Sequence, residues 1–338
     1  MRKGQNPARN GLPAYSPHRL GVASLVYIPH MDGYFAEAFD ILKVELASLH
    51  AGTGEAFDLL VFDNGSCPEV QVSLQKLQAE GWMDWLILSR HNMGKTGALN
   101  WILGAMPNEM VGYCDSDIFF RPGWFEESKK ILDAFPQAGI ITAQPNFFDV
   151  FHGEGTAHLG LDQEDYEQSE YYPAVEVVDE YCKGIGASVE LTEKYRKQPL
   201  VRYRRRINGV EAVLGANHMQ FIGRREVLRQ ALPLEATRGL SPEEDRQFDM
   251  GLNRKGFVHL ATPSSYVVHM GNTLDESIRL EISRLDMQST CGRTRPDEQT
   301  AKSFSRRLLG WLAHSRILSR LLKRLYNGLF QIYTEGRN

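Results

Sequence analysis

The sequence predicts an α/β fold, with a mostly parallel sheet flanked by helices and followed by a helical C-terminal extension. Apolar runs of strand length alternate with helix-length segments through the first half, and polar residues gather where the apolar runs end. The chain of 338 residues is long enough to bury a large core. With 42% hydrophobic and 24% charged residues, it is neither extensively disordered nor a collagen-like fibre.

Strands and helices are expected to alternate along the first half of the chain. Near-continuous apolar runs are typical of parallel strands covered by helices on both faces. The expected strands are 22–28, 58–63, 84–89, 109–115 and 138–143. The expected helices are 34–50, 69–80, 96–106 and 123–134. Because ligands of such sheets bind at the carboxyl ends of the strands, functional residues should follow directly after each strand.

Residues 145–210 break this pattern with a Tyr- and acid-rich stretch followed by a basic one. We expect a variable insertion here, either an acceptor-facing region or a solvated charged surface. Regular structure is expected again after residue 215, with a helix near 242–254 and short strands at 257–261 and 265–269. The predicted organisation is an N-terminal extension 1–19, a main domain 20–272 and a C-terminal helical, basic amphipathic extension 273–338.

Charge and cysteine content narrow the partners and the compartment. The net charge of −4 gives no general attraction to nucleic acid, so we expect no nucleic-acid partner. The four cysteines form no CxxC pair, which fits a reducing cytoplasm. The apolar run LGVASLVYI at 20–28 is too short to span a bilayer and is interpreted as the first strand, not a signal peptide.

The segment RHNMGKTGALN at 90–100 contains GKT, the end of a nucleotide-binding P-loop. That pattern also needs a glycine five places before Gly94, so that backbone N–H groups can surround the phosphates. Ser89 occupies this place. The segment therefore needs another explanation.

Two carboxylates follow the apolar run VGYC at 111–114, in the order Asp115-Ser116-Asp117. In an extended segment, side chains two apart project to the same side. Two carboxylates on one face repel unless a cation lies between them, and Mg²⁺ or Mn²⁺ with diphosphate oxygens would suit them. The alternative is a surface turn that merely contains two acids.

Three further residues have a functional and a structural interpretation. Asp63, before Asn-Gly-Ser, can accept hydrogen bonds from a ribose or a base, or can serve as a turn or helix N-cap residue. Ser241 and Glu244 form a capping box, and the helix dipole keeps Asp245 in the first turn ionised and ready to accept a proton. Both acids can equally well only stabilise the helix end. His269 follows an apolar strand and can bind a metal, although a lone histidine is usually a packed or surface residue.

The order of these motifs resembles that of a family-2 glycosyltransferase of the GT-A fold, inverting and of DxD type, over residues 20–272. The motifs are IPHMDGYF, VFDNGS, RHNMGKTGALN, YCDSDIFF, GANHMQFIGRREVL, PEEDRQF and HMGN. The resemblance implies sugar transfer from a nucleoside-diphosphate donor, uridine diphosphate in first place, to a hydroxyl of a saccharide, lipid-linked or small-molecule acceptor. Such a reaction serves glycan, polysaccharide or glycolipid synthesis.

The resemblance also implies a role for each site residue. The opening motif becomes a helix start that lines the donor site, because Asn92, Gly94, Ala98 and Asn100 fit the family pattern. The implied donor-binding residues are Pro29, His30, Met31, Asp63, Arg90, Asn92, Gly94, Lys95, Asp115 and Ser116. The implied ligands of Mn²⁺ or Mg²⁺ are Asp115, Asp117 and His269. The implied acceptor residues are Asn217 and His218. The implied catalytic residues are the base Asp245 and its neighbour Glu244. Two departures are Ile118, where the family often has another acid, and ALPLEATRGLSP in place of a glycine-rich turn.

The sequence leaves two alternative functions open, as well as the role of the segment 302–333. A sugar-1-phosphate nucleotidyltransferase would need an early glycine-rich basic loop, of which only Gly33 is present. A non-catalytic binding module would not need the acids and the histidine named above. At 302–333, apolar and basic residues recur at helical spacing, which suits the anionic inner face of a membrane or, alternatively, packing on the main domain or a partner.

Overall fold

The computed structural model describes residues 15–147, 164–235 and 242–284. The chain divides into two compact units, 1–292 and 293–338, and every described residue belongs to the first. The amphipathic segment 302–333 lies outside the described residues, so its membrane contact stays a prediction. Within the described ranges, no helix is both long and apolar enough to cross a bilayer.

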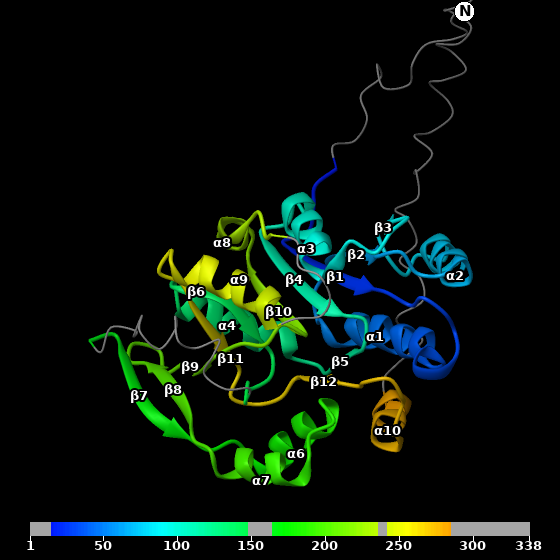
Figure 1. Ribbon diagram of the computed structural model, residues 1–338. Helices are drawn as coiled ribbons and strands as arrows, with labels where there is room; N and C mark the ends of the chain where they lie inside the picture. Colours follow the sequence, from blue (N-terminus) through cyan, green and yellow to red (C-terminus); the bar gives the residue numbers. More distant parts are fainter. Residues whose placement is uncertain (1–14, 148–163, 236–241, 285–338) are drawn as a thin grey trace, which may run out of the picture. The chain divides into compact units, whose positions relative to one another are not determined.

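The elements alternate as the sequence predicts, with ends shifted by a few residues (Figure 1). The strands are β1 Leu20–Val26, β2 Phe57–Asp63, β3 Trp85–Leu88, β4 Met110–Asp115, β5 Ile118–Phe120, β6 Ala138–Thr142, β7 Tyr166–Tyr171, β8 Leu200–Arg205, β9 Glu211–Leu214, β10 Gln220–Arg224, β11 Val258–Ala261 and β12 Val267–His269. The helices are η2 Gly33–Phe35, α1 Ala38–Gly52, α2 Pro68–Ala79, α3 Gly94–Ala105, α4 Trp124–Ala134, α6 Val175–Gly184, α7 Val189–Lys197, α8 Arg225–Leu228, η3 Arg229–Ala231, α9 Pro242–Asn253 and α10 Glu276–Arg284.

The predicted α/β fold is confirmed, with parallel strands at its centre. In the described part of the chain, one sheet has the order β3-β2-β1-β4-β10-β6-β11-β9-β8-β7. The strands β3, β2, β1 and β4 are parallel to their neighbours. β10 enters antiparallel between β4 and β6, and β9, β8 and β7 continue the sheet as antiparallel strands. The sheet is therefore mixed, and the parallel strands carry the first half of the site.

Helices cover both faces of the sheet because successive strand residues are apolar on both sides. Val22 packs with the helices α1, α2 and α4, whereas its neighbour Ala23 packs with α3, α8 and α9. Leu59 and Leu60 in β2 divide in the same way. Figure 1 shows α3, α8 and α9 on one side of the strands. This double covering explains why the strands read as continuous apolar runs and not as alternating ones.

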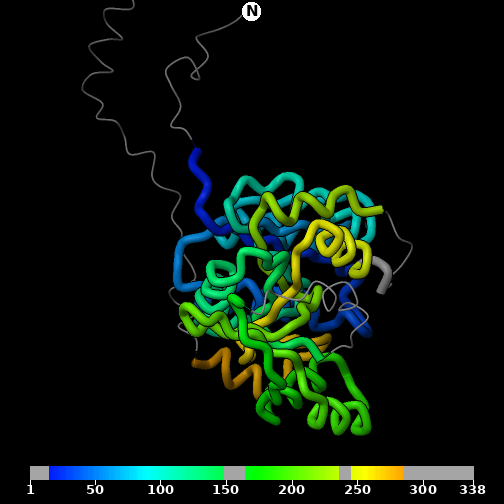
Figure 2. The backbone as a smooth tube through the Cα atoms, turned by 90° about the vertical axis from the view of Figure 1, so that its left-hand side faces the viewer, coloured from blue at the N-terminus to red at the C-terminus, as the bar shows by residue number. Residues whose placement is uncertain are grey.

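The described part of residues 145–210 is regular structure and not only a loop or charged surface. β7 and β8 pair and extend the main sheet, and α6 and α7 pack beside them. A separate core forms there around Phe147, Tyr181 and Tyr195. This region gathers at one end of the unit (Figure 2). Its core is aromatic and its strands carry exposed charges, so hydrophobic periodicity does not reveal it.

β5 and β12 form a second, two-stranded sheet. Val267, Val268 and His269 pair with Phe120, Phe119 and Ile118. Beyond β12, Ile278 of α10 packs on Phe119. α10 therefore belongs to the same compact unit as the sheet.

Candidate active site

The carboxyl ends of the parallel strands bring the predicted donor residues to one edge of the sheet. Val26 lies beside Asp63, and Leu25 lies beside Asp115, in the register of β1 with its two neighbours. Parallel strands that are in register end on the same side, so the strand pattern alone places Asp63 and Asp115 at one edge of the sheet. The chemistry of the two residues nevertheless differs.

Asp115 is held by two partners at the end of β4. Tyr113 donates its hydroxyl to Oδ1 at 2.5 Å, and Lys95 donates from Nζ to Oδ2 at 3.3 Å. Burial raises the pKa of Asp115 above its ordinary value, the charge of Lys95 opposes this rise, and the charge of Asp117 adds to it. The charge of Lys95 thus limits how far burial raises the pKa of Asp115.

Asp117 points to His269 and not along the direction of Asp115. The sequence treats this stretch as extended, but β4 ends at Asp115 and a turn at 116–117 precedes β5. His269 Nε2 lies 3.1 Å from Asp117 Oδ2, and His269 Nδ1 lies 2.7 Å from the carbonyl oxygen of Gly184. Burial lowers the pKa of His269, but the hydrogen bond and charge of Asp117 outweigh it and raise the pKa to about 9.

The pair of Asp117 and His269 has the donor atoms that a hard divalent cation needs. Asp117 Oδ1 is buried and has no hydrogen-bond partner among the described residues. The carboxylate suits Mn²⁺ or Mg²⁺, whereas the imidazole is a softer ligand that fits Mn²⁺ better than Mg²⁺ and binds only after His269 releases its proton. The third predicted ligand, Asp115, is engaged by Lys95 and Tyr113, and within the described ranges no three acidic, His or Cys side chains are arranged as a preformed metal site.

His218 lies between two aspartates of α9. Its Nε2 is 2.9 Å from Asp249 Oδ1, and its Nδ1 is 3.5 Å from Asp245 Oδ1. The side chains of His218 and Asp249 are 4% and 3% exposed, whereas that of Asp245 is 32% exposed. Burial lowers the pKa of His218, but the charges of Asp249 and Asp245 outweigh it, so the pKa is raised. Only Asp245 of the two acids has open access to a substrate.

Lys95 connects Asp115, at the end of β4, to His218 and its neighbours. Its Nζ donates to the carbonyl oxygen of His218 at 2.9 Å as well as to Asp115, and it lies 5.4 Å from the centre of the Tyr113 ring. The backbone N–H of Asp115 also donates to the Met219 carbonyl oxygen at 2.8 Å. The end of β4 and the segment before β10 are therefore fixed to each other.

The predicted acceptor residue Asn217 presents an amide without a partner. Its backbone is held by Thr142, which accepts from the Asn217 N–H at 2.9 Å. Both polar atoms of the Asn217 side chain, and Oε1 of Gln144, are buried without a hydrogen-bond partner among the described residues. Buried polar atoms are normally paired, so these atoms are suited to bind a polar ligand or ordered water. The side chain of the predicted catalytic residue Glu244 lies outside the described residues.

The predicted nucleoside residue Asp63 takes the turn role that the sequence left open. It is fully buried, accepts the Ser66 N–H at 3.1 Å and accepts Gln71 Nε2 at 2.7 Å. Next to it, Asn64 donates to Asn92 Oδ1 at 3.1 Å and accepts the Met93 N–H at 3.0 Å. These contacts join the loops after β2 and β3 and set the start of α3.

Gly65 should be required where these two loops meet. It has φ of +87°, and a Cβ there would lie 2.8 Å from the Asn92 backbone nitrogen. We expect Gly65→Ala to lower the free energy of unfolding by about 1–2 kcal/mol from the left-handed backbone alone, and further through the clash. Urea denaturation measures this. Gly104→Ala is the control: its Cβ would meet nothing within 4 Å, so equal destabilisation of both variants would contradict the expectation.

The remaining predicted donor residues lie on the exposed loops of the same edge. Met31 is 46% exposed, and His30 is exposed and paired with Asp32. Arg90 is exposed, Pro29 is half-buried, and Ser116 lies in the turn between β4 and β5. Gly94 begins α3 with a φ of +75°. No contact of these residues by itself assigns a donor role.

Sequence reasoning missed three residues that shape the site. Asp249 has a signal in the sequence, because its spacing of four from Asp245 puts both carboxylates on one face of α9. For Tyr113, the only signal in the sequence is its position two residues before Asp115, which puts both side chains on one face of the strand. Glu45 of α1 has no sequence signal, yet it is fully buried beneath the site and accepts from Ser24 Oγ at 3.1 Å and Cys114 Sγ at 3.0 Å.

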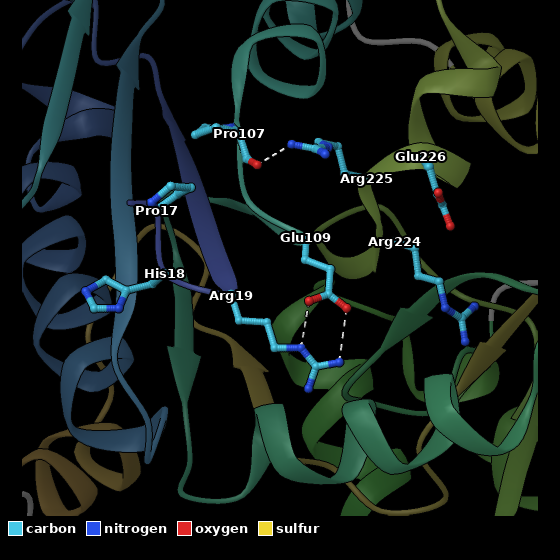
Figure 3. Close-up of a pocket in the computed structure, with 8 residues that line it drawn as sticks. All are labelled: Pro17, His18, Arg19, Pro107, Glu109, Arg224, Arg225 and Glu226. Atoms are coloured by element: carbon cyan, nitrogen blue, oxygen red, sulfur yellow. Dashed lines mark hydrogen bonds and ion pairs between the residues drawn. The ribbon is translucent and has the colours of Figure 1, made fainter. Parts of the chain in front are cut away.

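A cavity of about 630 Å³ lies at the opposite ends of these strands (Figure 3). Three of its charged side chains are already engaged: Arg19 makes two contacts to Glu109, at 3.0 and 3.1 Å, and Arg225 donates to the Pro107 carbonyl oxygen. Ligands of α/β sheets bind at the carboxyl ends of the strands, so this cavity is not our candidate active site.

Comparison with known proteins identifies part of the chain. Residues 34–190 match the family model described as glycosyl transferase family 2. The match includes Asp63, Asp115 and Asp117 but ends before Asp245 and His269. No curated protein sequence matches the chain.

Several solved structures are similar to the chain at low identity. Staphylococcus aureus TarS 1–349 has a TM-score of 0.42 and 12% identity, and the match covers 79% of this chain and 63% of that one. GalNAc-T7, solved with UDP, GalNAc and Mn²⁺, has a TM-score of 0.43 and 12% identity over 73% of this chain and 42% of its own. The mannosyltransferase PcManGT from Pyrobaculum calidifontis, solved with GDP-Man and Mn²⁺, has a TM-score of 0.33 and 18% identity. Its match covers 44% of this chain and 41% of that one. The matches thus span less than two thirds of each of these proteins.

Proposed function

We propose, from the match of residues 34–190 to the glycosyl transferase family 2 model, that the chain moves a sugar from a nucleoside-diphosphate donor to an acceptor hydroxyl with inversion. The proposed donor nucleotide is uridine diphosphate, and the proposed cofactor is Mn²⁺ or Mg²⁺. The acceptor belongs to the saccharides, lipid-linked glycans or small molecules with hydroxyl groups. The product is then a glycan, a polysaccharide or a glycolipid.

One observation carries the proposal: the two proposed ligands of a cation and the proposed base belong to one connected site. Asp117 and His269 form the pair at the sheet edge. Lys95 connects their neighbour Asp115 to the backbone of His218, whose ring faces Asp245. Inverting transfer needs a positive centre at the leaving diphosphate and a base at the attacking hydroxyl, and this arrangement supplies a place for each.

The chain's own groups then perform distinct parts of the reaction. Asp245, half-buried and in the first turn of α9, accepts the proton of the attacking hydroxyl. Lys95 keeps a positive charge next to Asp115, at the donor end. The amides of Asn217 and Gln144 can hydrogen-bond hydroxyl groups of a sugar. A cation held by Asp117 and His269 would supply the charge that neutralises the departing diphosphate.

We also place the reaction in the cytoplasm, with residues 302–333 on the anionic inner face of a membrane. The three cysteines in the described residues, Cys67, Cys114 and Cys182, are free, which is compatible with a reducing compartment. The basic amphipathic pattern of 302–333 is the only support for the membrane contact.

Nucleotide binding should be visible as thermal stabilisation that depends on the metal. UDP, GDP and TDP are compared with and without Mn²⁺ by differential scanning fluorimetry. We expect UDP with Mn²⁺ to raise Tm most, because a ligand at a hundred times its Kd stabilises by about 2.7 kcal/mol.

Asp117→Asn should lose the metal-dependent part of this shift, and Asp133→Asn, an exposed acid paired with Lys129 on α4, should keep it. A chain that none of the three nucleotides stabilises, with or without Mn²⁺, would refute the proposed function.

A further inference from the structure

We propose that His218 is a positioning residue that orients the base Asp245, and that Asp249 in turn holds His218. This inference rests on the proposed function, because it takes Asp245 as the base. The sequence predicts His218 as an acceptor residue. Its side chain is instead 4% exposed and faces two carboxylates. A group so enclosed acts on a substrate through its neighbour.

The two ring nitrogens of His218 serve different carboxylates. Nε2 is 2.9 Å from Asp249 Oδ1, and Nδ1 is 3.5 Å from Asp245 Oδ1. The carboxylates are four residues apart on α9, so one helix face presents both of them to one imidazole. The contact to Asp249 fixes the ring, and the fixed ring then presents Nδ1 to one oxygen of Asp245.

The ring plane is fixed by packing as well as by Asp249. Phe248 and Phe221 contact the His218 ring edge-to-face, with centroids 5.6 and 6.0 Å away. The His218 carbonyl oxygen accepts from Lys95 at 2.9 Å, which fixes its backbone. Asp249 is itself braced, because His259 Nε2 lies 3.3 Å from its carbonyl oxygen and 3.6 Å from Oδ1.

The charges around His218 favour an imidazolium that donates from both nitrogens. Two carboxylates of α9 face it, and Lys95 of α3 is the opposing cation. His259 of β11 also approaches Asp249 Oδ1, with its Nε2 at 3.6 Å. The 3.5 Å between Nδ1 and Asp245 Oδ1 is an ion-pair distance, and a doubly protonated ring can shorten it to a hydrogen bond by donating Nδ1–H to Oδ1. The other oxygen of Asp245 is then left for the acceptor hydroxyl, which gives the base a defined orientation. Loss of such orientation can cost about 10²-fold in rate.

Histidine titration tests the contact without any substrate. Carbon-13-labelled histidine is followed by NMR against pH in the full chain, and the His218 signal is assigned by its absence in His218→Asn. We expect the pKa of His218 to fall in Asp245→Asn and in Asp249→Asn, because each change removes a facing negative charge. Asp133→Asn should leave it in place. An unchanged His218 pKa in Asp245→Asn would overturn the proposal.

A matched pair of amide variants separates positioning from a structural role. Asn places its N–H near the position of histidine Nδ1, towards Asp245, and Gln places its N–H near Nε2, towards Asp249. Release of nucleoside diphosphate is measured from UDP-glucose, UDP-N-acetylglucosamine and GDP-mannose with Mn²⁺, together with urea denaturation of each variant. We expect His218→Gln to lower kcat by about 10²-fold with little change in the donor KM, and His218→Asn to retain more activity.

A structural role predicts the opposite order, since Gln keeps the buried contact to Asp249 and should keep more stability. If kcat of the two variants follows their stability, the inference is wrong. His50→Asn, a histidine whose Nε2 contacts the Trp82 carbonyl oxygen away from the site, controls for loss of an imidazole. If wild-type protein releases nucleotide from none of the donors, the proposed function fails at that step, and the histidine titration alone decides whether His218 and Asp245 are coupled.

Discussion

Asp245→Asn should lower turnover by about 10²–10⁴-fold, the usual contribution of a general base, while donor binding stays close to that of the wild type. The amide cannot accept a proton from the acceptor hydroxyl but occupies the same space. The side chain is one-third exposed and lies 3.5 Å from His218 Nδ1, so the amide of equal size creates no cavity and keeps an oxygen to which the ring can donate. The activity loss is therefore not expected to come from unfolding.

The measurement is the steady-state release of nucleoside diphosphate, with donor affinity taken from the Mn²⁺-dependent thermal shift. Asp40→Asn on α1, an exposed acid paired with Lys43, is the matched control and should behave as wild type. Full turnover in Asp245→Asn would exclude this residue as the base. A parallel loss of the donor-induced shift would instead make it a donor-binding residue.

Glu45→Gln should make the protein less sensitive to alkaline pH. Glu45 is fully buried, and burial raises its pKa well above the ordinary value, although hydrogen bonds from Cys114 and Ser24 oppose the rise. The negative charges of Asp117 and Asp115 add to it. In the folded chain the group thus keeps its proton at pH values where the unfolded chain has released it.

The direction of the effect follows from this difference. The unfolded chain ionises Glu45 above about pH 4.3, so the folded state loses stability as pH rises from there towards the folded pKa, by up to about 1.4 kcal/mol per pH unit. Glutamine cannot ionise, its carbonyl oxygen can accept from one of the two partners, and its NH2 group can donate to the other, as the OH of a protonated Glu45 does. The stability advantage of Glu45→Gln over wild type should therefore grow with pH.

Urea denaturation between pH 4 and pH 9 measures this advantage. Glu55→Gln is the control, because Glu55 is exposed and its replacement should leave the pH dependence of wild type. Parallel stability curves for Glu45→Gln and wild type would show that Glu45 is not held protonated in the fold.

Hydrophobic pattern alone predicted the parallel centre of the sheet. Val22 and Ala23 are both apolar because helices cover both faces, and that requirement is visible in any single strand. The edge that carries Asp63 and Asp115 follows from the same pattern, since parallel strands end on one side. The antiparallel strands β7 and β8 could not be found this way, because their buried residues are only Tyr166, Leu200 and Tyr203 and many of their other residues are charged.

The sequence could not show which side chains contact Asp115 and Asp117. Asp115 and Asp117 were expected to point the same way, as residues two apart in a strand do. Because a turn replaces the strand after Asp115, one carboxylate meets Lys95 and the other meets His269. Ile118, a departure from the family pattern, is buried in β5 and pairs with His269, which places the imidazole beside Asp117.

The sequence by itself determined the class of fold, the alternation of strands and helices along its first half, and the motifs of the candidate site, because these depend on periodicity and on local pattern. Tertiary structure alone decided which groups meet: Lys95 with Asp115 and His218, and His218 with Asp245 and Asp249. Such contacts join residues 20 to 123 positions apart, and their geometry is set by how β4, β10 and α9 pack. Local sequence carries no record of that packing, so only the tertiary structure shows the link from Asp115 through Lys95 to His218 and Asp245.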